Sequence, residues 1–221
     1  LLYAWGDNTS GILGTGDTIS RSSPVLIGSS SWTLVVAGVS YALAIRADGP
    51  LYGWGLNTSG QLGLIDAISR SSPTLIASGV WSKASATSQA AAIKSDGSLW
   101  TWGPNNVGQL GLNDTILRSS PVQVGTSSWS QVSVSHSSMS AIDNAGKLYV
   151  WGLNGASSNT STSLGLNDNF NRSSPTQIAI GKSFTQVALN AYRTSRGDGA
   201  LSMAIRSDGT LWTWGLGTSG R

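Results

Sequence analysis

An aspartate and an arginine recur together at a fixed spacing along the chain. In four places the aspartate stands four residues before the arginine: Asp17 and Arg21, Asp66 and Arg70, Asp114 and Arg118, and Asp168 and Arg172. A ring of such groups could bind a cation or a phosphate. One aspartate per loop, however, falls short of the roughly six to eight oxygen ligands that Ca²⁺ takes. We therefore favour a structural interpretation, either an ion pair within one loop or an aspartate that caps a turn.

A second recurring group is the indole of a Trp-Gly pair. It occurs once in every copy of the pattern described below, at Trp5, Trp54, Trp102, Trp151 and Trp214. Such tryptophans could line an aromatic cage for a ligand. Their identical place in each copy instead favours packing, because burying one tryptophan removes roughly 200 Å² from water.

The residues needed for catalysis, metal binding or cofactor binding are scarce. The chain has no cysteine and one histidine, His136, which lies among serines. It contains no Gly-x-Ser-x-Gly elbow, and no phosphate-binding glycine loop stands between a strand and a helix. We therefore expect no enzyme activity, no metal site and no cofactor.

The composition narrows the class of partner. Charged residues make up 10% of the chain, and the formal net charge of +3 comes from dispersed lysines and arginines. Without a basic run, the electrostatic signal for nucleic-acid binding is weak. No apolar stretch reaches the ~20 residues that span a bilayer. We expect the partner to be a protein, or neighbouring chains of an assembly.

The recurring groups belong to a repeated unit of about 49 residues. Each copy begins with Leu-(Tyr/Trp)-x-Trp-Gly, and Arg-Ser-Ser-Pro and a bulky aromatic residue follow. We interpret residues 1–221 as one partial domain with copies at 2–50, 51–98, 99–147 and 148–210, and an incomplete copy at 211–221. Tandem copies of this length and strand content are typical of β-propellers, in which each unit buries its apolar faces against its neighbours.

Each copy is rich in short strand patterns and lacks a helical one. Apolar runs flank Asp48-Gly49, Asp96-Gly97 and Asp208-Gly209, which predicts hairpins with type I′ turns, and Asn144-Ala145-Gly146 predicts a longer version. A further strand begins at the aromatic residue, as at Trp81, and another opens at the proline, as at Pro121. Four short strands per copy predict one blade of a β-propeller.

The string Trp-Gly-x-Asn-x-x-Gly-Gln-Leu-Gly at residues 54–63 and 102–111 resembles the regulator of chromosome condensation repeat. The resemblance covers the whole chain and implies an all-β propeller, which in the founding member has seven blades. We therefore expect four full blade repeats plus part of a fifth, as a fragment of a larger ring. This chain has Tyr41, Gln89 and Ser137 or Ser138 where the family usually has histidine.

The fourth copy contains two polar insertions, within residues 154–165 and 192–200. Polar insertions are typical of surface loops that carry function, so we expect partner contacts at Ser157, Asn159, Tyr192, Arg193, Arg196 and Asp198. Asn-x-Ser/Thr sequences, which mark exposed glycosylation acceptors in secreted proteins, begin at Asn8, Asn57, Asn113, Asn159 and Asn171.

The function that these features favour is a non-enzymatic propeller for protein interaction or structure, in an extracellular, cell-surface or virion (phage) setting. One alternative is the role implied by the founding member of the family, a guanine-nucleotide exchange factor or a chromatin-binding regulator. Another is a propeller-type enzyme inhibitor. Fold resemblance alone does not transfer any of these functions.

Overall fold

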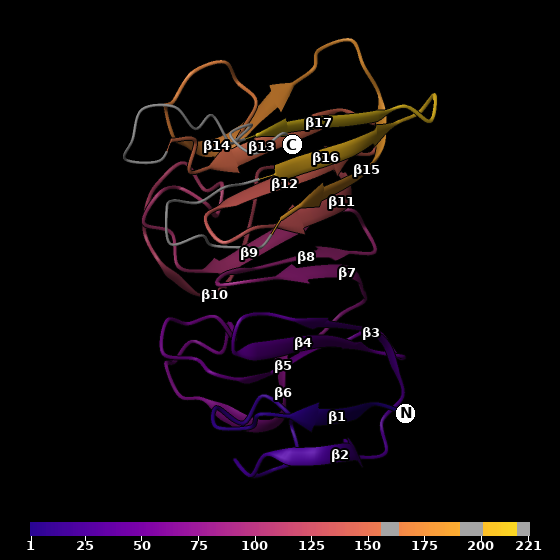
Figure 1. Ribbon diagram of the computed structural model, residues 1–221, viewed down its shortest axis with the longest axis vertical. Coiled ribbons are helices and arrows are strands. Elements are labelled where there is room, and N and C mark those ends of the chain that lie inside the picture. Colours follow the sequence, from indigo (N-terminus) through magenta and orange to yellow (C-terminus); the bar gives the residue numbers. More distant parts are fainter. Residues whose placement is uncertain (156–163, 191–200, 216–221) are drawn as a thin grey trace.

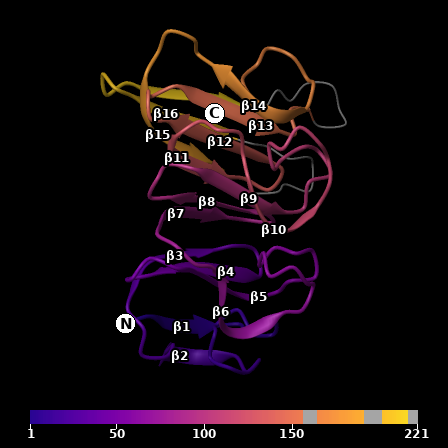
Figure 2. The same cartoon turned by 180° about the vertical axis from the view of Figure 1, so that it is seen from behind.

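The computed structural model describes residues 1–155, 164–190 and 201–215. Every regular element in these ranges is a β-strand, and no helix occurs there. The seventeen strands form five antiparallel sheets that are stacked one after another (Figures 1 and 2). The predicted all-β fold of propeller type is confirmed.

Three of the sheets have four strands, and the first and last have fewer. The first sheet consists of β1 (Tyr3–Gly6) and β2 (Arg21–Leu26). The second consists of β3 (Trp32–Ala37), β4 (Tyr41–Arg46), β5 (Leu51–Gly55) and β6 (Arg70–Ala77). The third consists of β7 (Trp81–Ala86), β8 (Ala90–Lys94), β9 (Leu99–Gly103) and β10 (Arg118–Gln123). The fourth consists of β11 (Trp129–Val134), β12 (Ser138–Asp143), β13 (Leu148–Gly152) and β14 (Arg172–Ile178). The fifth consists of β15 (Phe184–Leu189), β16 (Leu201–Arg206) and β17 (Leu211–Gly215).

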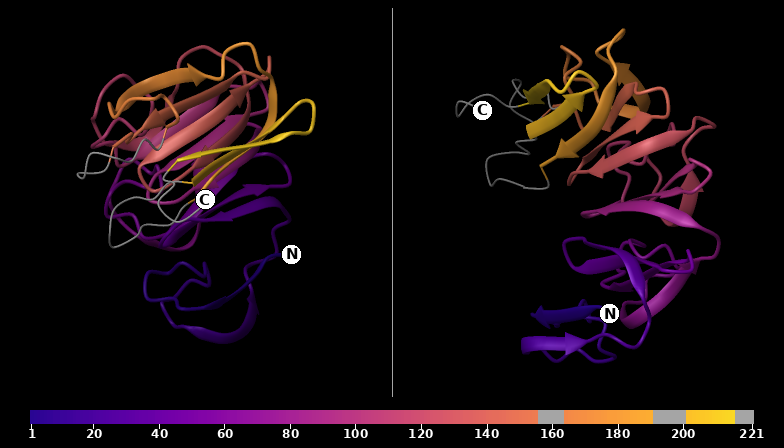
Figure 3. Two further views of the ribbon diagram at one scale, coloured as in Figure 1. Left: turned by 45° about the horizontal axis from the view of Figure 1, so that its top comes forward. Right: turned by 90° about the vertical axis from the view of Figure 1, so that its right-hand side faces the viewer.

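The sheets follow a curve, which the side view in Figure 3 shows plainly. The strands that begin at the aromatic residue, β3, β7, β11 and β15, lie against one another from sheet to sheet. The sheets therefore converge along these inner strands and diverge towards the outer strands β2, β6, β10 and β14. This is the arrangement of propeller blades around an axis.

The sequence copy and the sheet are out of phase. Residues 51–98, one copy of the sequence pattern, supply β5 and β6 to the second sheet and β7 and β8 to the third. Each copy therefore joins two neighbouring sheets covalently, and the chain crosses from the outer strand of one sheet to the inner strand of the next.

The hairpin turns differ from the predicted type I′ geometry. The glycines have positive φ, as at Gly49 (112°) and Gly97 (87°), but no aspartate before them does among the described residues. The Gly49 N–H donates to the Arg46 carbonyl, and the Arg46 N–H donates to the Pro50 carbonyl. These bonds define a type I turn followed by a left-handed glycine, the common three-residue hairpin loop.

Residues 144–146 form the same loop with the same bonds, so the prediction of a longer turn there was wrong. The Gly146 N–H donates to the Asp143 carbonyl, as the Gly97 N–H donates to the Lys94 carbonyl. Ala145 simply takes the place of the aspartate in the other hairpins.

The proline of Arg-Ser-Ser-Pro lies within the outer strand, whereas we predicted that it would open the strand. In β10 the register shifts between Arg118 and Val122, around Pro121. The shift removes the need for a ladder hydrogen bond from the proline, and the outer strand has no neighbour on its other side. Edge strands and bulges are the places in a sheet where proline is tolerated.

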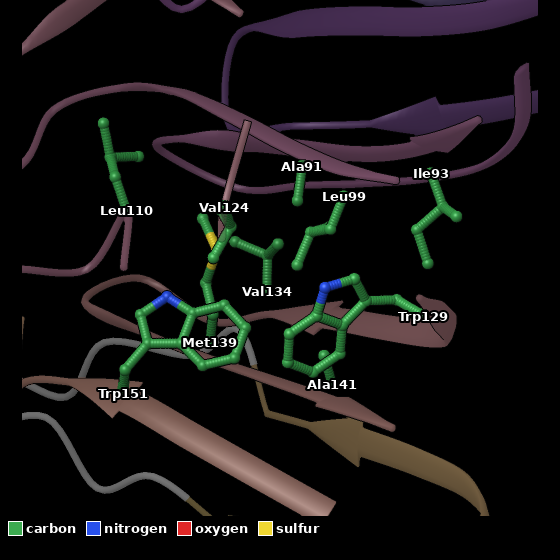
Figure 4. Close-up of a cluster of buried hydrophobic side chains, with 10 residues drawn as sticks. All are labelled: Ala91, Ile93, Leu99, Leu110, Val124, Trp129, Val134, Met139, Ala141 and Trp151. Carbon is green, nitrogen blue, oxygen red and sulfur yellow. The ribbon is translucent and has the colours of Figure 1, made fainter. Parts of the chain in front are cut away.

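The core lies between the faces of successive sheets. Figure 4 shows the cluster between the third and fourth sheets, where Ala91, Ile93 and Leu99 face Trp129 and the side chains of Met139, Ala141 and Trp151. Leu99, Met139 and Trp151 are fully buried. Neither sheet could bury these side chains alone, so neighbouring sheets depend on each other for stability.

The Trp-Gly tryptophans of the second, third and fourth sheets pack against the glycine-rich loop of the preceding sheet. Each of these Nε1–H groups donates to a loop carbonyl, from Trp54 to Ile12 at 2.7 Å, from Trp102 to Gln61 at 2.9 Å and from Trp151 to Gln109 at 3.0 Å. A Cβ on Gly14 would lie 2.8 Å from the Trp54 Nε1, so this close approach requires glycine. Trp5 in the first sheet is 62% exposed, and Trp214 in the fifth is partly buried.

Candidate interaction rim

The stacked sheets have two different rims. One rim, on the right in Figure 1, carries the short hairpin turns, and we call it the hairpin rim. The opposite rim carries the loops that lead into the outer strands β2, β6, β10 and β14. These loops are at residues 7–20, 56–69, 104–117 and 153–171, the last described except for 156–163. We call this second rim the long-loop rim, and it lies on the left in Figure 1.

A buried asparagine organises each long loop. In the second sheet, the Asn57 side chain is fully buried and its Nδ2 donates to both the carbonyl and the Oδ1 of Asp66. Its Oδ1 accepts the N–H of Leu62 at 2.8 Å. The same contacts recur at Asn8, Asn105 and Asn154. A buried amide whose donors and acceptor are all paired gives each loop one well-defined conformation.

The recurring aspartate and arginine close the loop from the outside. Asp66 Oδ1 accepts the N–H of Ile68 at 2.9 Å, and its Oδ2 lies 2.6 Å from Arg70 Nη2. The Arg70 Nη1 donates to the Ile68 carbonyl. We call these three residues the clamp, and it recurs as Asp17, Ile19 and Arg21, as Asp114, Ile116 and Arg118, and as Asp168, Phe170 and Arg172.

The hydrogen bonds of the clamp stabilise the charged form of its aspartate. In Asp66 the N–H of Ile68 lowers the pKa of the carboxyl most, and the bond from Arg70 lowers it further. The same backbone donor is the largest cause of the lowered pKa in the other three clamp aspartates, Asp17, Asp114 and Asp168. Each carboxylate therefore already accepts hydrogen bonds from donors in its own loop.

The middle residue of each clamp points an apolar side chain into solvent. The exposed fractions are 64% for Ile19, 64% for Ile68, 63% for Ile116 and 69% for Phe170. Single exposed apolar residues are ordinary on protein surfaces. Here an exposed apolar residue occupies the same position in four consecutive sheets. Its N–H donates to the clamp aspartate, and its carbonyl accepts from the clamp arginine. The sequence shows this row as an apolar residue two positions before each clamp arginine, a signal that our sequence reasoning missed.

The inner part of the same rim contains a polar network that joins neighbouring sheets. The Tyr41 hydroxyl donates to the Gln89 carbonyl, and the Gln89 Nε2 donates to the Ser135 carbonyl. His136 Nδ1 lies 2.7 Å from the Ser88 hydroxyl. This serine belongs to the preceding sheet, so the local sequence around His136 did not reveal the pair. No carboxylate among the described residues contacts the imidazole, and the orienting acid of a catalytic triad is missing there.

The residues predicted to contact a partner in the two insertions lie outside the described residues. These are Ser157, Asn159, Tyr192, Arg193, Arg196 and Asp198. The described residues beside the first insertion, 155 and 164, belong to the loop at residues 153–171, and those beside the second, 190 and 201, lie at the end of β15 and the start of β16. The expectation that the Asn-x-Ser/Thr asparagines are exposed was wrong for Asn8 and Asn57, because both are buried as the organising amides of their loops.

The described ranges contain no group of three or more histidine, cysteine, aspartate or glutamate side chains that could hold a metal ion. They also contain no helix long and apolar enough to cross a membrane. What the long-loop rim offers chemically is a set of rigid apolar contacts whose neighbouring charges are paired.

Comparison with known proteins relates the chain to one repeat family. The sequence profile of the regulator of chromosome condensation (RCC1) repeat matches residues 1–45, 48–90 and 96–142, which is more than half of the chain. A second profile of the same repeat matches residues 32–61. No curated protein sequence matches the chain.

Several solved structures share the fold. Human WBSCR16 has a TM-score of 0.77 at 19% identity, covering 96% of this chain and 56% of that protein. Prp20p from Saccharomyces cerevisiae, reported with its binding properties to Gsp1p and histones, has a TM-score of 0.71 at 20% identity, covering 84% of this chain and 49% of that one. Yeast RCC1 (Prp20) bound by Kap60 has a TM-score of 0.76 at 18% identity, with coverage of 97% and 52%. The chain thus spans about half the length of these structures, and the likeness shows the fold.

Proposed function

Because the chain belongs to the regulator of chromosome condensation repeat family, we propose that it is a non-enzymatic β-propeller that binds a partner protein through its long-loop rim. The observation that carries this proposal is the row of clamped, exposed apolar side chains, one in each of four consecutive sheets. Solved relatives of the fold have been studied in complexes or for their binding to other proteins, which agrees with this role.

The clamps make the row of exposed apolar side chains suitable for binding a partner. A partner that buries Ile68 does not need to order the loop first, because the buried amide of Asn57 and the Asp66–Arg70 pair already hold it. Preorganised contacts lose less entropy on association than mobile ones. Spacing the contacts over several sheets also lets one partner engage more than one of them.

The paired charges favour a protein over a nucleic acid at this rim. Each clamp arginine lies within 2.6 Å of its own aspartate, so its guanidinium is partly neutralised within the loop. Nucleic-acid binding depends on lysines and arginines that neutralise phosphates. What remains accessible at the clamps is chiefly apolar, which is the character of the buried centre of protein interfaces.

A photo-crosslinking residue placed at position 68 tests the proposal, with the same residue at position 180 as control. Ile180 is 81% exposed but lies in the connection from β14 to β15, at the hairpin rim. We expect a discrete protein adduct from position 68 and none from position 180. The adduct then identifies the partner for affinity measurements.

The affinity of that partner should fall in the double variant Ile68→Ser, Ile116→Ser and stay unchanged in Ile180→Ser. Burying one such side chain contributes about 1.5–3 kcal/mol, which corresponds to roughly ten- to a hundredfold in Kd for each contact made. Equal affinities of the double variant and the wild type would refute a role for this rim.

A further inference from the structure

In each of the second to fifth sheets, two aromatic rings meet edge to face near the hairpin turn. One ring belongs to the first strand of the sheet and the other to the third. The pairs are Trp32 with Tyr52 at 5.4 Å, Trp81 with Trp100 at 6.3 Å, Trp129 with Tyr149 at 5.2 Å, and Phe184 with Trp212 at 6.2 Å between ring centroids. We call each pair an aromatic corner.

In three of the four corners the chain itself places a cation over the ring. The Arg46 guanidinium lies 5.0 Å from the Tyr52 centroid, the Lys94 ammonium lies 4.3 Å from Trp100, and the Arg206 guanidinium lies 5.6 Å from Trp212. These distances are typical of cation–π interactions, in which the ring face attracts positive charge.

The fourth sheet reverses the charge at this position. The residue that corresponds to Arg46, Lys94 and Arg206 is Asp143, the cross-strand neighbour of Trp129. Its Oδ1 accepts the N–H groups of Ala145 and Lys147, and its Oδ2 lies 3.5 Å from the Tyr149 hydroxyl. This aromatic corner therefore has a carboxylate beside it and no cation of its own among the described residues.

A pocket of about 500 Å³ opens at the same corner. Trp129 and Tyr149 line it from the fourth sheet, and Gln123, Val124 and Ser127 line it from the outer strand of the third sheet and the connection that follows. The pocket thus borders the aromatic pair on the face that lies towards the preceding sheet.

Two basic residues near the pocket must be considered. Arg118 lines it, but its guanidinium is bonded to Asp114 at 2.5 Å and to the Ile116 carbonyl. Lys147 is exposed on the hairpin and contacts Asp143 through its backbone N–H. Neither places its charge over Tyr149, so neither fills the position that Arg46 or Lys94 occupies in its own corner.

We propose that the corner formed by Asp143, Tyr149 and Trp129 binds a basic side chain, arginine or lysine, of a partner protein. The two rings supply the attraction that the other sheets satisfy with their own cation, and Asp143 adds a carboxylate beside Tyr149. The pocket, which Trp129 and Tyr149 line, supplies the space. Burial and the neighbouring Asp143 raise the pKa of the Tyr149 phenol, so the ring stays neutral. The pocket is lined by Arg118 of one clamp but by none of the exposed apolar residues of the clamps, and the proposed site does not depend on the function proposed for those residues.

The probe for this site is the blocked tripeptide acetyl-Gly-Arg-Gly-amide, titrated into the ¹⁵N-labelled chain and followed by amide chemical shifts. We expect saturable shifts centred on Gly146, Lys147 and Tyr149, with a Kd on the order of millimolar, since a few favourable contacts sustain only weak binding. The matched peptide with glutamate in place of arginine should produce none of these shifts.

Three variants complete the test, and the first two have opposite expectations. Asp143→Arg restores the cation of the other corners and should weaken binding of the arginine peptide at least tenfold. Arg46→Asp converts the corner of Tyr52 to the arrangement of the fourth sheet and should create new shifts there. A milder variant, Asp143→Asn, should weaken binding several-fold while keeping the size of the side chain. Unaltered binding in Asp143→Arg, or shifts of equal size with the glutamate peptide, would overturn the proposal.

Discussion

Replacing Trp102 with alanine tests how the sheets hold one another. Trp102 is fully buried between the second and third sheets, and its indole donates to the Gln61 carbonyl at 2.9 Å. Trp5 occupies the same place in the sequence pattern but is 62% exposed. Trp5→Ala therefore removes the same side chain from a position where it is not packed, and it is the matched control.

The expected loss follows from the buried area. A buried tryptophan removes roughly 200 Å² from water, and at about 25 cal/mol per Å² this contributes about 5 kcal/mol as an upper estimate. Large-to-small changes in protein cores cost about 3–5 kcal/mol for this residue type. We expect Trp102→Ala to lower the free energy of unfolding by about 4 kcal/mol, and Trp5→Ala by less than about 1 kcal/mol.

Urea titrations of the three proteins measure this difference. Circular dichroism and tryptophan fluorescence should give coincident transitions if unfolding is two-state. With a slope of about 2 kcal/mol per M, the midpoint of Trp102→Ala should fall by about 2 M. Equal midpoints for the two variants would refute the conclusion that the Trp-Gly tryptophans join the sheets.

Three further predictions concern the loops and turns. Asn57→Ala leaves the Leu62 N–H without its acceptor and should destabilise the chain by about 1–3 kcal/mol in the same titration. The lowered pKa values of the clamp aspartates mean that the folded chain holds their protons less tightly than the unfolded chain. The melting temperature should therefore be steady from about pH 7 to 5 and fall as the pH drops below about 4. The fall should be less steep in Asp66→Asn, which lacks one of the clamp carboxylates. An equally steep fall in that variant would contradict the role given to these carboxylates. Gly55→Ala should strongly destabilise the folded chain, because the φ of Gly55 is +103° and a Cβ there would lie 2.6 Å from Tyr41 Cα. Gly28→Ala is the control, because a Cβ at Gly28 would meet nothing within 4 Å. Similar melting temperatures for the two variants would contradict this geometric argument.

Much of the fold could be predicted from local patterns. The spacing of Leu-x-x-Trp-Gly and Arg-Ser-Ser-Pro identified the strands, and the glycine after each hairpin aspartate identified the turn, because only glycine readily takes its positive φ. The turn type and the place of Pro121 were wrong. Both depend on how the chain bonds to its own sheet, which the type of residue at one position does not determine.

The candidate site was only partly predictable. The pairing of Asp66 with Arg70 follows from their spacing in one loop, and an ion pair within the loop was one of the two predicted roles. The exposure of Ile68 did not follow, because an apolar residue in a strand-rich chain is normally counted as core. The pairing of Ser88 with His136 joins two copies, and neither position stands out in its own segment.

The repeated unit, the strand content and the residues that each copy shares can be read from the sequence, because they depend on periodicity and on local backbone preferences. The tertiary structure decided which tryptophans are covered, how each copy is divided between two sheets, and which side chains of one sheet meet the next. It also showed where the charge reversal at Asp143 lies. A single charge in a hairpin has no evident role until strand pairing in the fourth sheet places it beside Trp129 and Tyr149, which line a pocket that the third sheet also borders.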